Sequence, residues 1–125
     1  MLALPDKRKT PDSSRQSTSV YKLLERYHQE ATSPTLSEVM DFARFWVEDL
    51  ANLEKNSPKE FFDWAVGHFQ SGNVDIHCNV WKDTEFFEQI EYLIKGGFVY
   101  DLSVLRKEKN KESFNEFYML LASTR

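Results

Sequence analysis

The chain has 125 residues, which suits one domain that buries roughly two-thirds of its unfolded surface. Only 41% of the residues are hydrophobic, but 14% are aromatic, so large rings can build a core. The net charge of −4 argues against a general attraction to nucleic acid, and the single cysteine excludes an internal disulfide. No apolar run approaches the roughly 20 residues that span a bilayer, so we expect a cytoplasmic protein without a membrane segment.

Residues 1–16 are predicted to be a disordered tail. They are rich in Lys, Ser, Asp and Pro, and they show no hydrophobic period. They also lack the apolar stretch of a signal peptide. The remaining residues, 17–125, are expected to form a single globular domain.

Two amphipathic helices are predicted in the first half of that domain. The first is expected from about Val20 to Ala31, before Ser33-Pro34 breaks the chain. The second begins with a capping box, in which Thr35 is the N-cap and Glu38 follows three residues later. A regular hydrophobic stripe continues this helix to Leu53.

A third helix is predicted from Pro58 to the residues before Gly72. Ser57 is its expected N-cap, and proline is favoured at the first helical position. Gly72 can take the left-handed conformation that ends a helix. The side chains expected to face the core are Phe62, Ala65, Val66 and Phe69.

The hydrophobic period then changes from helical to alternating. Hydrophobic and polar residues alternate over 74–80, which predicts a short strand. Another helix is expected from about Asp83 to Lys95, and a strand over 98–105. Two interpretations stay open for residues 113–122. Ser113 and Glu116 form a capping box, which slightly favours a helix, whereas the alternation beyond them suits the second strand of a C-terminal hairpin.

These elements predict an α+β fold that is predominantly helical. It would contain four to five helices, a short strand near 74–80 and the C-terminal hairpin. The order of helix, strand, loop and strand near the C-terminus weakly resembles that of a winged helix.

The sequence offers no recognisable catalytic or metal site. The three histidines and the cysteine lack the local spacings of zinc sites, and no glycine-rich phosphate loop occurs. We therefore expect no catalytic residue, no metal and no cofactor. One enzymatic alternative stays open, in which His68 and Cys78 meet in space as a base and a nucleophile.

Several aromatic and polar residues fall outside the main hydrophobic stripes and are our candidates for binding a partner: Trp64, His68, Asp75, His77 and Trp81. Exposed aromatic residues are favoured at protein interfaces. Residues 35–63 hold seven acids and three bases, which would steer the protein towards a basic surface. The leading hypothesis is a non-enzymatic regulatory or inhibitory protein that binds another protein, as an inhibitor, an immunity-type protein or an adaptor.

The alternative hypothesis is a winged-helix-like regulator that contacts nucleic acid. Its phosphate contacts would come from the basic loop over residues 106–111, through Arg106, Lys107, Lys109 and Lys111. The preceding helix argues against this interpretation, because it carries three glutamates at a spacing of three residues. A homo-oligomer joined by the stripe of the second helix also stays open.

Overall fold

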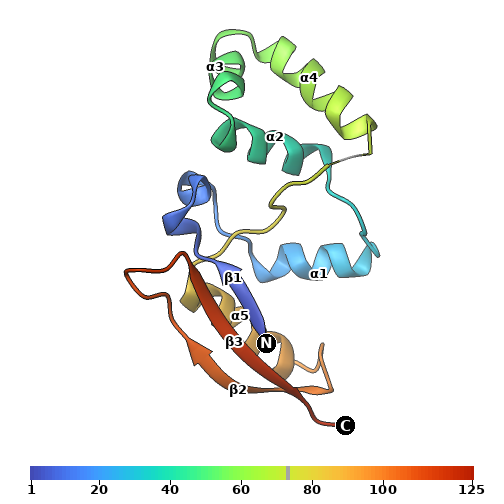
Figure 1. Ribbon diagram of the computed structural model, residues 1–125. Helices are drawn as coiled ribbons and strands as arrows, with labels where there is room; N and C mark the ends of the chain where they lie inside the picture. The colour runs from blue at the N-terminus through green and yellow to red at the C-terminus, as the bar shows by residue number, and fades with distance from the viewer. Residues whose placement is uncertain (73) are drawn as a thin grey trace.

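The computed structural model describes residues 1–72 and 74–125. In chain order its elements are β1 (Leu2–Pro5), the 3-10 turns η1 (Lys7–Lys9) and η2 (Pro11–Ser14), α1 (Val20–His28), α2 (Leu36–Trp46), α3 (Glu48–Asn56), α4 (Pro58–Gln70), α5 (Asp83–Lys95), β2 (Leu102–Glu108) and β3 (Glu116–Ser123). Figure 1 shows α2, α3 and α4 gathered at one end, the sheet and α5 at the other, and α1 with the 3-10 turns between them. The predicted fold class, a predominantly helical α+β fold, is confirmed.

The sheet is antiparallel, with the strand order β1-β3-β2. Its core is a cluster in which Phe86 and Phe87 of α5 pack against Phe117 of β3, with ring centroids 5.6 and 5.5 Å apart. The predicted hairpin is therefore present, although its first strand begins at Leu102 rather than near residue 98. The slight preference for a helix over 113–122 is wrong, because alternate burial of Phe117 and Met119 outweighs the local capping signal.

The N-terminal residues belong to the fold, so the prediction of a disordered tail is wrong for residues 2–15. β1 pairs along β3, with Leu2 opposite Met119 and Pro5 opposite Glu116. The chain then continues into η1 and η2, which bury four charged side chains: Asp6, Lys7, Asp12 and Arg15. Tertiary pairing, rather than local hydrophobicity, orders this segment.

The second predicted helix is two helices. The chain is extended at Val47, with φ −124° and ψ 109°, and this residue ends α2 and precedes α3. The hydrophobic stripe that crosses this point therefore serves two helices that pack against α4. The start of α2 follows the prediction, because Glu38 N donates a hydrogen bond of 3.2 Å to the Thr35 hydroxyl.

α4 has the predicted bounds but a different inward face. Phe61 and Ala65 are buried against α2 and α3, whereas Phe62 and Phe69 are exposed. The buried side of α4 is therefore rotated around the helix axis relative to the predicted one. The Ser57 side chain forms no capping hydrogen bond with α4.

The strand predicted at 74–80 is absent from the described residues 74–80. The chain there is extended but pairs with no strand, and a single bridge joins Trp81 to Asp6. Its polar groups are satisfied differently: Thr18 N donates to Val80 O, and Val80 N donates to the Thr18 hydroxyl, at 2.9 and 3.0 Å. Among the described residues, no helix is long and apolar enough to cross a membrane.

Candidate functional site

Trp64 and His68 lie one turn apart on α4 and stack on each other. Their ring centroids are 5.1 Å apart with an interplanar angle of 12°. The inner side of the indole faces buried Phe61, with ring centroids 6.4 Å apart. Trp64 is 37% exposed, so the indole keeps contact with solvent although Phe61 and His68 stack on it.

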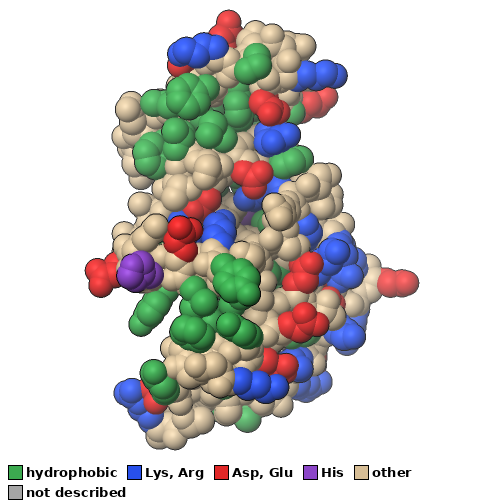
Figure 2. Space-filling model, turned by 180° about the vertical axis from the view of Figure 1, so that it is seen from behind, with side chains coloured by type: hydrophobic (Ala, Val, Ile, Leu, Met, Phe, Trp, Pro, Cys, Tyr) green, Lys and Arg blue, Asp and Glu red, His purple; other side chains and the backbone are tan. Residues whose placement is uncertain are grey.

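Phe62 and Phe69 are exposed on the opposite shoulder of α4, at 43% and 39%. Residues three and four apart share a side of a helix, so Phe61 and Ala65 lie on one buried side. This buried side separates the two exposed shoulders. We call Phe62, Trp64, His68 and Phe69 the aromatic face of α4. Figure 2 shows hydrophobic side chains gathered over the end of the molecule formed by α2, α3 and α4.

The aromatic face lies in an acidic part of the chain. Residues 47–70 hold five acids and two bases, which leaves a net charge of −3 with histidine neutral. The acids are Glu48, Asp49, Glu54, Glu60 and Asp63. One of the two bases, Lys59, is paired with Asp63 and also lies over the Phe62 ring. The exposed rings thus lie on a helix pair, α3 and α4, whose residues carry a net negative charge.

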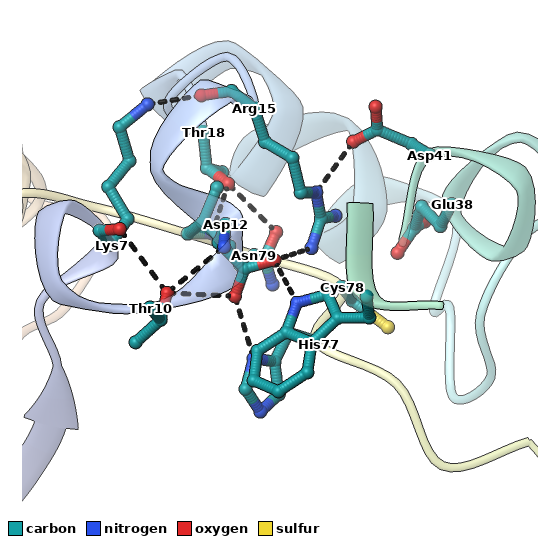
Figure 3. A network of polar contacts seen from close by, with 12 residues as sticks. Lys7, Thr10, Asp12, Arg15, Thr18, Glu38, Asp41, His77, Cys78 and Asn79 are labelled. Carbon is teal, nitrogen blue, oxygen red and sulfur yellow. Dashed lines mark hydrogen bonds and ion pairs between the residues drawn. The ribbon is translucent and has the colours of Figure 1, made fainter. Parts of the chain in front are cut away.

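His77 belongs to a different place, a polar network centred on Asp12 of η2 (Figure 3). Asp12 is 1% exposed, and its carboxylate accepts hydrogen bonds from His77 Nδ1 at 2.8 Å and Trp46 Nε1 at 2.5 Å. It also pairs with Arg15 Nη1 at 2.8 Å. Burial raises the pKa of Asp12, but the hydrogen bonds from these three partners outweigh burial and hold the pKa below its ordinary value.

The ring of His77 packs edge-on against Trp46 and Phe42 of α2, with centroids 4.9 and 5.7 Å away. Because the carboxylate can only accept, the Nδ1 atom carries the proton in this arrangement. The network therefore holds η2, α2 and the segment before α5 together.

The other candidates are separated from the aromatic face. Trp81 packs on Phe86 of the sheet core, with centroids 5.2 Å apart, and its indole N–H donates to Gln89 Oε1 at 3.0 Å. Asp75 is exposed on the segment between α4 and α5. The five predicted residues therefore do not form one surface: Trp64 stacks on His68, His77 contacts Asp12, and Trp81 packs on the sheet core.

The basic loop predicted over residues 106–111 is only partly a loop, because residues 106–108 belong to β2, and its charge is partly neutralised. Arg106 pairs with Glu108, and Lys107 pairs with Glu91 of α5 at 2.5 Å. Lys109 and Lys111 are exposed. Two of the four residues proposed to contact phosphate thus already pair with acidic side chains.

Cys78 and His68 are held by different neighbours. His68 stacks on Trp64, whereas the thiol of Cys78 lies beside Glu38 of α2. Burial raises the pKa of Cys78 to about 11, and the charge of Glu38 acts in the same direction. The thiol is therefore protonated at neutral pH, which disfavours the nucleophile that the enzymatic alternative requires. Within residues 1–72 and 74–125, no group of three or more His, Cys, Asp and Glu side chains could hold a metal ion.

Sequence reasoning missed two parts of the aromatic face and the centre of the polar network. The sequence pattern predicts Phe62 and Phe69 in the core, whereas in the structure Phe61 is buried and both of them are exposed. Asp12 had no local signal, because its partner His77 is 65 residues away. Comparison of the chain with protein-family models, with curated proteins and with solved structures found no match.

Proposed function

We propose that this protein is a non-enzymatic regulatory or inhibitory protein that binds a basic protein through the aromatic face of α4. The observation that carries the proposal is the exposure of Phe62, Trp64 and Phe69 on one helix, each more than a third accessible. Tryptophan and other large aromatic residues are enriched among the residues that dominate binding energy. The stacked indole of Trp64 loses little conformational freedom on binding, because it is already held from both sides.

The charge around the face selects the kind of partner. A basic partner would be attracted to the net charge of −3 over residues 47–70. A second copy of the chain would bring two such surfaces together across a two-fold axis, and like charges would then oppose association. We therefore favour a different, basic protein over a homodimer.

The nucleic-acid alternative has weaker support. Arg106 and Lys107 have acidic neighbours, and the overall charge is −4. Binding to duplex DNA would have to rely mainly on Lys109 and Lys111, and few phosphate contacts give weak attraction.

The test is affinity capture from native lysate with the full chain and two matched variants. Trp64→Ala removes the largest exposed ring of the aromatic face. Tyr100→Ala removes an exposed aromatic ring that lies between α5 and β2, outside the α2–α4 end. The expected result is one stoichiometric protein that binds the unchanged chain and Tyr100→Ala but is lost with Trp64→Ala. Truncating a central interface aromatic typically costs at least about 2 kcal/mol, or roughly thirtyfold in Kd.

The chemistry of the captured protein completes the test. The expected partner has a basic isoelectric point, and its capture weakens as salt is raised. A partner retained equally by Trp64→Ala, an acidic partner, a dimer of this chain, or no stoichiometric partner would each overturn the proposal.

A further inference from the structure

A polar pocket of about 490 Å³ opens between α1 and α2. Its walls come from the segment that leads into α1, from the facing sides of both helices, and from Cys78 and Val80. Small-molecule pockets have volumes of about 300–1,000 Å³. This one is unusual because hydroxyl and charged groups dominate its lining and none of its lining residues is aromatic.

The carboxylate of Glu38 lines this pocket, and its two oxygens differ in their hydrogen bonds. Glu38 is 6% exposed, and its Oε1 accepts from Arg26 Nη1 at 2.5 Å and from the Thr35 hydroxyl at 3.1 Å. Its Oε2 is buried and has no hydrogen-bond partner within residues 1–72 and 74–125. The thiol of Cys78 lies beside the carboxylate (Figure 3), but a thiol is a weak donor. A buried acceptor in this state favours a ligand that donates to it.

Lys22 of α1 places a donor near Glu38 Oε2. Its Nζ donates to the Cys78 carbonyl oxygen at 2.7 Å and lies 3.9 Å from Glu38 Oε2. An ammonium group has three N–H donors, so Lys22 keeps capacity for a ligand. The pocket thus offers one strong acceptor and one strong donor side by side.

The charges of the lining balance, so the pocket has no net charge that would select an anion or a cation. Three bases line it, Arg15, Lys22 and Arg26, together with three acids, Glu25, Glu38 and Asp41. Arg15 pairs with Asp41 at 2.8 Å, and Arg26 pairs with Glu38. A ligand that both donates and accepts suits this lining, and the hydroxyl group does so without carrying charge.

We propose that this pocket binds an uncharged, polyhydroxylated small molecule of the sugar class. One ligand hydroxyl accepts from Lys22 Nζ, and a small movement of the Glu38 side chain lets a neighbouring hydroxyl donate to Oε2, which is buried without the ligand. Serine and threonine hydroxyls of the lining supply the remaining polar contacts.

The test is saturation-transfer NMR with D-ribose and D-glucose, each at about 10 mM, which detects dissociation constants near 1 mM. Glycine and inorganic phosphate serve as zwitterionic and anionic probes. The variants are Glu38→Gln and Lys22→Met, and Glu60→Gln on exposed α4 is the matched control. Circular dichroism confirms that each variant is folded, and Lys22→Met keeps the test decisive if Glu38→Gln is unstable.

The expected result is saturation transfer to a sugar by the unchanged chain and by Glu60→Gln. Affinity falls at least about tenfold in Lys22→Met and in any folded Glu38→Gln, because each loses a hydrogen bond to a charged group. Transfer to neither sugar, transfer only to glycine or phosphate, or equal affinity in the folded variants would overturn the proposal. The pocket is separate from the aromatic face of α4, so failure here leaves the protein-capture result unchanged.

Discussion

Replacing Asp12 by alanine is expected to lower the free energy of unfolding by about 3–5 kcal/mol. The carboxylate is buried and accepts hydrogen bonds from Trp46, Arg15 and His77 at 2.5–2.8 Å. In the variant, the buried guanidinium of Arg15 keeps only the half-exposed carboxylate of Asp41 as its counter-charge. Trp46 loses the acceptor that the structure gives its indole N–H. A domain of this size is typically stable by only about 5–15 kcal/mol, so the loss is a large fraction of the total.

The measurement is urea denaturation followed by circular dichroism and tryptophan fluorescence. Asp12→Asn, which keeps the size and one acceptor oxygen, is expected to lose less than Asp12→Ala. Asp75→Ala removes an exposed carboxylate from the segment that carries His77, and its effect is expected to stay within about 0.5 kcal/mol. A loss below about 1 kcal/mol for Asp12→Ala would refute the reasoning, because that small effect is typical of a carboxylate in a disordered tail.

Three further predictions concern pH, the core and the thiol. Because the native pKa of Asp12 lies below its ordinary value, its stabilising effect is present above about pH 4 and is lost as the pH falls through the native pKa. The difference in free energy of unfolding between the unchanged chain and Asp12→Ala should therefore become smaller on acidification, and a constant difference would contradict this. Phe117→Ala should cost about 3–5 kcal/mol in urea denaturation, and a cost under about 1 kcal/mol would show that the sheet core is misplaced. Glu38→Gln should move the pH–rate profile of Cys78 with a thiol reagent to lower pH, whereas an unchanged profile would remove Glu38 as a cause of the raised pKa.

The sequence predicted the helices whose signals are local. α4 and α5 follow the expected bounds closely, because their periodic hydrophobic faces are delimited by proline, glycine or acidic residues. The break at Val47 could not be read from the pattern, since hydrophobic spacing continues across it. Its cause is tertiary: Trp46, the last residue of α2, is held by Asp12 and His77 from distant parts of the chain.

The strands required information that local sequence does not contain. β1 is four residues long and gains its stability from β3 at the other end of the chain. β3 carries both a capping signal and an alternating pattern, and burial of Phe117 and Met119 decides between them. The contacts of the candidate residues likewise differ in whether the local sequence predicts them. Trp64 and His68 are one turn apart and could be paired from sequence, whereas the contacts of His77 with Asp12 and of Trp81 with the core come from the fold.

The most direct test of the proposed function is photo-cross-linking within living cells at one position of α4. A benzophenone amino acid replaces Phe62 on the aromatic face, and the same group replaces Tyr100 outside the α2–α4 end as the reference. The account predicts that position 62 cross-links in high yield to one basic protein and that position 100 does not. Equal yields at both positions, cross-links between copies of this chain, or no discrete product at position 62 would contradict binding through the aromatic face of α4.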